Sequence, residues 1–297
     1  MSYNFTEEQK DKLIKHGGSG FYSQVLQAIE LYTQKWQLSE LRFNDDYSIS
    51  PIFFCKSELY GDCVLKMYDD DEIAVEYNAL CEYNGGFYIR AFEYGNIENK
   101  LGVMLIERAV PGKTLINEPS LEKRLAVFSE LFIGRHIEPK KPEIYGYYAD
   151  WIIDTADDII SKREDDKERY VHALKAKEIY LETASVYDRK LLIHTDLHSG
   201  NIISCGDVKY KIIDFNRAVI GDPVFETGMF ILYECCWRDK EPEKAEAVLD
   251  YLEKSINIPN IILRQCLYIT AVIGHWDIDR VKFAESVMNK GRGRKNG

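Results

Sequence analysis

Apolar residues recur at helical spacing near the start of the chain and over most of its second half. Tyr22, Val25 and Ile29 share one helical face, which predicts an amphipathic helix after a flexible, glycine-rich stretch at residues 17–20. Over residues 41–108 the pattern changes to short runs rich in β-branched and aromatic residues, namely ISPIFFCKS, CVLKMY, FYIRAFEYG and LGVMLIERA. These runs predict a small antiparallel sheet.

One helical pattern interrupts the predicted strands. In residues 71–83 the side chains of Ile73, Tyr77 and Leu80 form an apolar stripe that is suited to pack on a sheet. Glu76 lies beside this stripe. We therefore expect a single helix inside the strand-rich part of the chain.

The second half of the chain is mostly helical. Ser120 is suited to cap a helix, and long helical patterns follow over residues 145–163 and 167–189 and again towards the C-terminus. The change of texture predicts two domains. Residues 1–108 form a lobe of strands and helices, and residues 109–297 form a helical lobe.

Two β-prone segments lie inside this helical half, LLIHTDLHSGNII at residues 191–203 and VKYKIIDF at residues 208–215. The first holds a dense polar cluster, which a loop between two short strands would expose. The second carries a carboxylate at the end of an apolar strand. The polar residues of interest are His194, Asp196, His198, Asn201 and Asp214.

The spacing of these residues meets the requirements of phosphoryl transfer. Asp196 can orient an acceptor hydroxyl, while Asn201 and Asp214 supply hard oxygen ligands of the kind that Mg²⁺ prefers. A different interpretation is a metal-hydrolase ligand set in His194, Asp196 and His198, because alternate residues of an extended segment share a face. The kinase interpretation accounts for more of the sequence, since a hydrolase does not require Asn201 or Asp214.

The motif HTDLHSGNII, followed by IIDFNRAVIGDPVFETG, resembles the signature of the aminoglycoside phosphotransferase family, which belongs to a kinase-like superfamily that includes choline-kinase-like enzymes. The resemblance implies a two-lobed, protein-kinase-like α+β fold, with a small antiparallel β lobe, a larger helical lobe and a nucleotide between them. It implies that Asp196 is the catalytic base and that Asn201 and Asp214 are the metal ligands. It also implies that His194, His198 and Asp222 are structural residues that support the catalytic loop.

The same resemblance places nucleotide-binding residues in the strand-rich half. CVLKMY resembles the strand that carries the triphosphate-binding lysine, which is then Lys66. Its ion-pair partner is expected at Glu76, with Glu72 as the alternative. GVMLIERAVPGKTL resembles the segment between the lobes, where backbone groups from Glu107 to Ala109 would bind the purine.

Two positions depart from the pattern of many kinases. The phosphate-covering segment, residues 44–50, reads NDDYSIS and contains no glycine. Ser48 and Ser50 can donate hydrogen bonds to phosphates there, while the acids, Asp45 among them, are expected to turn to solvent. DFN replaces the DFG of protein kinases, and Asn216 is suited to a positive φ where glycine is usual.

Charge and cysteine content narrow the class of partner. The chain has 38 basic and 49 acidic residues, a net charge of −11, which opposes binding to nucleic acid or to an anionic membrane and suits a cationic acceptor. Seven scattered cysteines without a CxxC pair indicate reduced thiols. With no secretory signal and no apolar run of about 20 residues, we expect a cytoplasmic protein.

The resemblance implies an enzyme that moves the γ-phosphate of ATP or GTP, with Mg²⁺, to a hydroxyl of an aminoglycoside or a related cationic antibiotic. Metabolic kinases for choline, ethanolamine, sugars or homoserine share the same motifs and form the first alternative. A catalytically silent, nucleotide-binding regulator is the second alternative. The motif residues do not contact the distinguishing part of the acceptor, so these alternatives stay open.

Overall fold

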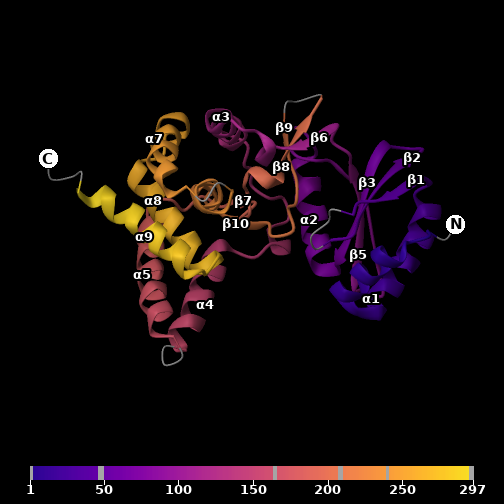
Figure 1. Cartoon of the computed structure of the whole chain (residues 1–297), viewed down its shortest axis with the longest axis horizontal. Coiled ribbons are helices and arrows are strands. Elements are labelled where there is room, and N and C mark those ends of the chain that lie inside the picture. Colours follow the sequence, from indigo (N-terminus) through magenta and orange to yellow (C-terminus); the bar gives the residue numbers. More distant parts are fainter. Residues whose placement is uncertain (1–2, 46–49, 163–165, 207–209, 239–240, 294–297) are drawn as a thin grey trace. The chain divides into compact units, whose positions relative to one another are not determined.

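The computed structural model describes residues 3–45, 50–162, 166–206, 210–238 and 241–293. The chain forms two compact units, which are described separately: unit 1 contains Met1–Gly112 and Ser204–Arg217, and unit 2 contains Lys113–Ile203 and Ala218–Gly297. Figure 1 labels their elements. The first break lies four residues beyond the predicted boundary at residue 108. Residues 204–217 join unit 1 because the backbone of Ile212 exchanges hydrogen bonds with Phe87 and Ile89.

An antiparallel sheet forms the core of unit 1, as the short apolar runs predict. Its strands lie in the order β1-β2-β3-β5-β4, and every neighbouring pair is antiparallel. Residues Cys63, Leu65 and Met67 of β3 are fully buried on one face. The strands are β1 (Leu38–Phe43), β2 (Ile52–Ser57), β3 (Gly61–Asp69), β4 (Ala91–Ile97) and β5 (Leu101–Glu107).

Helix α1 (Glu7–Lys35) begins earlier than the sequence pattern indicates. Thr6 and Gln9 form a capping box, in which each side chain bonds the backbone N–H of the other residue. The glycine-rich stretch is a kink inside this element, where Gly18 has a φ of 82°. Only glycine adopts that conformation without strain, so the kink replaces the expected flexible start.

Helix α2 (Asp70–Tyr83) matches the predicted helix to within one residue. Asp69 caps its first turn by accepting a hydrogen bond from the backbone of Asp71 at 3.1 Å. The helix buries Ile73, Glu76 and Leu80. A carboxylate among the buried residues indicates a charged partner.

Unit 2 is mostly helical, and Ser120 caps α3 as predicted by accepting a hydrogen bond from the backbone of Lys123 at 3.2 Å. Two strands, β7 (Leu191–Ile193) and β10 (Val219–Gly221), pair antiparallel beside the predicted catalytic segment. The helices are α3 (Leu121–Phe132), α4 (Tyr148–Ser161), α5 (Lys167–Ala184), α6 (Glu226–Leu232), α7 (Ala245–Ile256), α8 (Asn260–Ile269) and α9 (Ile278–Gly293). The remaining strands are β6 (Pro111–Thr114), β8 (Ile202–Cys205) and β9 (Tyr210–Ile212), of which β9 lies in unit 1.

Helices α6 and α8 approach each other closely at Gly228. A β-carbon on Gly228 would lie 2.3 Å from the backbone oxygen of Cys266 and 2.3 Å from Oγ1 of Thr270. Each helix continues into a π-helical segment, η5 (Tyr233–Arg238) after α6 and η7 (Thr270–Gly274) after α8. Glycine is therefore required at this crossing.

Among the described residues, no single helix has the length and apolar character of a membrane span. One bent pair, Ala245–Ile256 with Asn260–Gly274, meets both criteria together across a bend of 119°. All seven cysteines are free thiols.

Candidate active site

Lys66 lies in the middle of the sheet in unit 1. It pairs across the strands with Ile52 on one side and Met104 on the other, and its side chain is 8% exposed. The Nζ atom donates hydrogen bonds to Oε2 of Glu76 at 2.7 Å and to Oδ1 of Asp214 at 2.5 Å. The structure thus brings together three of the predicted site residues.

Glu76, and not Glu72, is the partner of Lys66 on helix α2. Its second oxygen, Oε1, accepts a hydrogen bond from the backbone of Phe215 at 3.2 Å. Glu72 lies one turn earlier and accepts a hydrogen bond from the Asn216 amide at 2.7 Å. Both acids therefore contact the segment that carries Asp214, but only Glu76 contacts the lysine.

The two carboxylates keep the Lys66 side chain charged. Burial works to lower the pKa of the Lys66 ammonium, but the charges of Glu76 and Asp214 outweigh burial and raise that pKa above its ordinary value of 10.5. A buried, permanently positive group at this position is suited to hold an anion such as a triphosphate.

Asp214 follows strand β9 and adopts a left-handed backbone conformation with a φ of 70°. The expectation of a positive φ at Asn216 is wrong: the positive φ is found two residues earlier, at Asp214, and the Asn216 side chain donates a hydrogen bond to Glu72. The Asp214 side chain is 42% exposed, although one oxygen is bound to Lys66. A partly exposed carboxylate is accessible to a cation.

Glu107 and Ala109, which are expected beside the purine, differ in the hydrogen bonds that their backbones make within the protein. The N–H of Glu107 donates to the carbonyl oxygen of Arg90 at 2.8 Å, and its carboxylate binds Nζ of Lys211 at 2.7 and 2.8 Å. Glu107 is therefore occupied within unit 1. Within the described part of the chain, Ala109 makes no hydrogen bond to another backbone group, and its contact with the purine stays a prediction.

Only one of the two serines of the predicted phosphate-covering segment lies within the described residues. Ser50 is a described residue and lies half-buried just before β2. Ser48 lies outside the described residues. Their contact with phosphates stays a prediction.

The predicted catalytic loop lies in unit 2, between β7 and β8. Thr195 turns the chain there with a φ of 63°, and the Asp196 side chain is 26% exposed. Nδ2 of Asn201 donates a hydrogen bond to the carbonyl oxygen of Asp196 at 2.9 Å. This bond fixes the amide of Asn201 and leaves its oxygen, Oδ1, as the atom suited to a metal ion.

Both histidines of the motif accept hydrogen bonds from the loop backbone. Nδ1 of His194 accepts from the N–H of Asp196 at 3.3 Å, and Nδ1 of His198 accepts from the N–H of Gly200 at 3.0 Å. His198 also stacks on Tyr233, with ring centroids 4.0 Å apart. Among the described residues, no three histidine, cysteine or acidic side chains form a metal-binding group. The contacts fit a supporting role for both histidines.

Glu226 is a buried support of the catalytic loop. Its carboxylate accepts hydrogen bonds from the backbone N–H of His194 and, at 2.7 Å, from Nε2 of His136. Burial works to raise the pKa of Glu226, but His136 and the backbone bond outweigh burial and lower that pKa below its ordinary value of 4.5. Sequence reasoning missed His136, which lies 90 residues away.

Asp222 is a second buried support. Its carboxylate accepts hydrogen bonds from Nε and Nη2 of Arg189 at 2.9 and 3.0 Å. It also accepts from the backbone N–H groups of Arg189 and Val224. Sequence reasoning missed Arg189, because a single basic residue in a polar connection carries no pattern.

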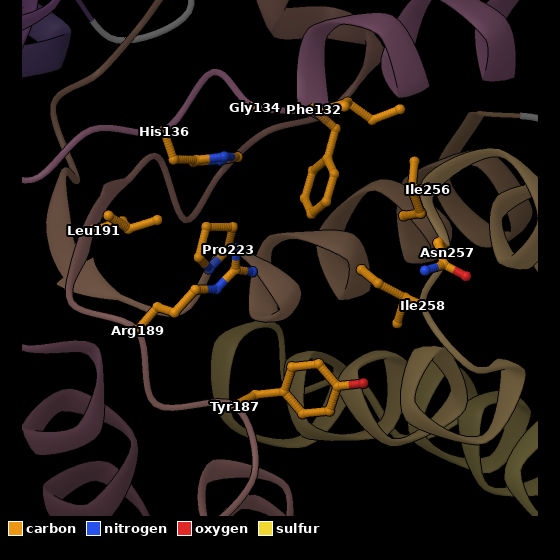
Figure 2. A pocket seen from close by; sticks show the side chains of 11 residues that line it. Phe132, Gly134, His136, Tyr187, Arg189, Leu191, Pro223, Ile256, Asn257 and Ile258 are labelled. Atoms are coloured by element: carbon orange, nitrogen blue, oxygen red, sulfur yellow. The ribbon is translucent and has the colours of Figure 1, made fainter.

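A cavity of about 350 Å³ lies beside these supports in unit 2. Figure 2 shows His136, Leu191 and Arg189 on one side of it, and Ile256 and Asn257 on the other. Neither Asp196 nor Asn201 is among its lining residues. The cavity therefore borders the residues that hold the loop and not the reacting groups.

A comparison with protein families gives a match over part of this chain. The model of the phosphotransferase enzyme family matches residues 137–257, which contain the whole catalytic loop. The predicted resemblance to phosphotransferase enzymes is confirmed. A comparison with curated proteins gives no match.

Solved structures of small-molecule phosphotransferases share the fold. A thermostable mutant of aminoglycoside phosphotransferase APH(4)-Ia, in complex with ADP and hygromycin B, is similar with a TM-score of 0.60 at 16% identity, over 88% of this chain and 96% of that chain. Choline kinase LicA from Streptococcus pneumoniae has a TM-score of 0.58 at 13% identity, over 88% and 97% of the two chains.

A third similar structure is the amicoumacin kinase hAmiN in complex with AMP-PNP, Ca²⁺ and Ami, with a TM-score of 0.57 at 12% identity, over 84% of this chain and 88% of that chain. At these identities the likeness shows the fold alone. The predicted kinase-like α+β fold is confirmed.

Proposed function

We propose that this protein transfers the γ-phosphoryl group of ATP or GTP to a hydroxyl of a small cationic molecule. The observation that carries the proposal is the buried ammonium of Lys66, which Glu76 and Asp214 hold charged in the middle of the sheet. Burying a charged lysine costs desolvation free energy, which ion pairs and hydrogen bonds to the ammonium must offset. A charged lysine in this setting is suited to neutralise a triphosphate.

The catalytic loop supplies the group that acts on the acceptor. In the proposal, the carboxylate of Asp196 accepts a hydrogen bond from the acceptor hydroxyl and aligns its oxygen with the γ-phosphorus. The backbone of the loop is held by Glu226 and by the two histidines, so the carboxylate is pre-positioned. Positioning and electrostatic stabilisation account for most of the rate in such reactions.

Magnesium is the metal that the donor atoms suit. The amide oxygen of Asn201 and the carboxylate of Asp214 are hard oxygen ligands, and Mg²⁺ takes few protein ligands when phosphates complete its coordination. When bound, Mg²⁺ would neutralise charge that develops on the phosphate oxygens. Ser50 and the backbone of Ala109 would add contacts to the phosphates and the purine.

The acceptor is proposed to be an aminoglycoside or a related cationic antibiotic. The net charge of −11 supports a cationic substrate, and the similar structures include proteins crystallised with hygromycin B or named for amicoumacin. LicA, which is named a choline kinase, supports a metabolic alternative of the same charge. The proposal places the enzyme in the cytoplasm, where free thiols and nucleoside triphosphates coexist.

A thermal-shift assay tests the proposal first. ATP or GTP at about 100 times its Kd stabilises a binding protein by about 2.7 kcal/mol, and the gain should require Mg²⁺. The Lys66→Met variant should lose this gain. The absence of a Mg²⁺-dependent gain with either nucleotide would refute the proposal, and a gain that does not require Mg²⁺ would favour the nucleotide-binding regulator without catalysis. Mass spectrometry of phosphate addition to hygromycin B, amicoumacin and choline then identifies the acceptor class.

A further inference from the structure

The cavity in unit 2 is walled by three segments that are far apart in the sequence. Residues 132–136 at the end of α3, residues 187–191 before β7 and residues 256–258 between α7 and α8 all contribute to it. Its volume of about 350 Å³ lies in the range of sites that hold small molecules, about 300–1,000 Å³. The space suits an apolar body, because most of the lining side chains are apolar: Phe132, Ile133, Leu191, Pro223, Ile256 and Ile258.

Arg189 is the only lysine, arginine or acidic residue among the described residues that line the cavity. Asp222 binds its Nε and Nη2 atoms at 2.9 and 3.0 Å, and no described residue binds Nη1. Both N–H groups of Nη1 therefore remain for another acceptor. The Arg189 side chain is 59% exposed, and Figure 2 shows it reaching past Pro223 toward the middle of the lining residues. The remaining donors are suited to a carboxylate.

His136 gives the cavity a second polar group. Its side chain is 7% exposed, and Nε2 binds Oε2 of Glu226 at 2.7 Å. In the part of the chain that the structure describes, no residue forms a hydrogen bond with the other ring nitrogen, Nδ1. Polar atoms of buried side chains normally have a partner, so Nδ1 of His136 indicates a polar partner from outside the chain.

His136 is connected to the catalytic loop by successive hydrogen bonds. It binds the carboxylate of Glu226, which accepts the backbone N–H of His194. Nδ1 of His194 in turn accepts a hydrogen bond from the N–H of Asp196 at 3.3 Å. A molecule that contacts His136 in the cavity therefore contacts the first member of a chain that ends at the backbone of the proposed catalytic base.

We propose that this cavity is an effector site for a small carboxylate with an apolar body. The carboxylate group binds Nη1 of Arg189 and lies against the imidazole of His136, and the apolar body packs between Phe132 and Ile258. The charge of the lining residues favours an anion here, although the whole chain carries −11. Binding restrains His136 and so stabilises the bonds that hold the catalytic loop. The effector role rests on the proposed function, whereas the binding itself does not.

Two probes of the same size test the class of ligand. Hydrocinnamate has a phenyl ring and one carboxylate, and hydrocinnamamide replaces the carboxylate by a neutral amide. For ligands of about 11 non-hydrogen atoms we expect a Kd of roughly 1–5 mM for the carboxylate and at least about fivefold weaker binding of the amide. In methyl NMR spectra of the full chain, the δ1 methyl signals of Ile133, Ile256 and Ile258 should shift on binding. The signal of Ile152, a buried residue of α4 outside the cavity, should not shift.

Three variants that each lower the net charge from −11 to −12 test the contacts. Arg189→Gln removes the cation, and Ile133→Asp places an acid on the cavity wall at a residue that is 54% exposed and tolerates a polar group. Val186→Asp is the matched control, because Val186 is 74% exposed and does not line the cavity. The Kd for hydrocinnamate should rise at least about fivefold in Arg189→Gln and Ile133→Asp and stay within about twofold in Val186→Asp. The Kd for the amide should change less than about twofold in the two aspartate variants.

The effector role has a measurement of its own. The amide hydrogen of His194, which is bonded to Glu226, reports on how firmly the loop backbone is held. With hydrocinnamate at about ten times its Kd, the exchange of this hydrogen should slow by up to about tenfold. Hydrocinnamamide at the same concentration should leave the exchange rate within about twofold of that of the free protein.

Each part of the inference can fail separately. The site is refuted if hydrocinnamate leaves the three isoleucine methyl signals of the cavity unshifted, or binds Ile133→Asp as tightly as wild type, a comparison that holds even where Arg189→Gln does not fold. Equal affinity for the carboxylate and the amide refutes the class of ligand. Unchanged exchange at His194 with the site occupied refutes the effector role. None of these measurements uses a nucleotide, so their failure leaves the proposed function intact, and a protein that binds no MgADP keeps the carboxylate site but loses the effector role.

Discussion

Replacing Glu76 with glutamine isolates the charge that holds Lys66. Glutamine has the shape of glutamate, and its amide oxygen can still accept the hydrogen bond from the backbone of Phe215. What disappears is the negative charge 2.7 Å from the Lys66 ammonium. Glu76 is 1% exposed, so water does not replace the lost charge.

The expected cost follows from the geometry. Removing one partner of a buried ion pair costs about 3–5 kcal/mol when the other charge is left without compensation. Lys66 keeps Asp214 at 2.5 Å, but Asp214 is 42% exposed and water screens its charge. We therefore expect Glu76→Gln to lower the free energy of unfolding by about 2–3 kcal/mol. The Kd for MgADP should also rise, because Lys66 then relies on Asp214 alone.

Urea denaturation of Glu76→Gln beside Glu72→Gln measures this effect. Glu72 lies on the same helix, is half-buried and does not contact Lys66, so its replacement should cost less than about 1 kcal/mol. Because the pKa of Lys66 in the folded protein exceeds its ordinary value of 10.5, its charge stabilises the fold at all lower pH values. Equal losses in the two variants would refute this account of the pair.

Four further changes test other parts of the structure. Asp196→Asn should lower kcat by roughly two or more orders of magnitude with little change in the Kd for MgADP, as steady-state kinetics and calorimetry will show. Asp214→Ala should instead weaken MgADP binding itself, and an unchanged affinity would remove Asp214 from the metal site. The pKa of Glu226 in the folded protein lies below its ordinary value of 4.5, so its negative charge stabilises the fold above that pH. The difference in urea midpoint between wild type and Glu226→Gln should therefore shrink as the pH falls below about 4.5. Gly228→Ala should cost about 3 kcal/mol, because its β-carbon meets backbone, whereas Gly20→Ala meets nothing within 4 Å and should stay within about 1 kcal/mol of wild type.

The sequence predicts those features of the fold that depend on residues close together in the chain. The apolar stripe of α2, the Ser120 cap and the strand around Lys66 are written within a few residues each, and the structure has all three. The sequence alone does not decide whether Glu76 or Glu72 pairs with Lys66, because both acids lie on the same helix and each contacts the segment after β9. Which of the two contacts the lysine is decided by packing.

Long-range supports left no trace in the sequence. His136 and Glu226 are 90 residues apart, and Arg189 and Asp222 are 33 apart, so neither pair forms a motif. The sequence pattern predicts a flexible stretch where the kink at Gly18 lies, because glycine occurs both at chain breaks and at positions of positive φ.

The interrupted course of unit 1 has a consequence for synthesis of the chain. Its second segment, Ser204–Arg217, is made only after the 91 residues of Lys113–Ile203, so the sheet around Lys66 is complete in sequence long before Asp214 exists. At typical elongation rates this delay lasts roughly 5–20 s. During that interval Glu76 is the only one of the two acidic partners of Lys66 that has been synthesised. The second partner, Asp214, becomes available to unit 1 only after residues 113–203 of unit 2 have been made.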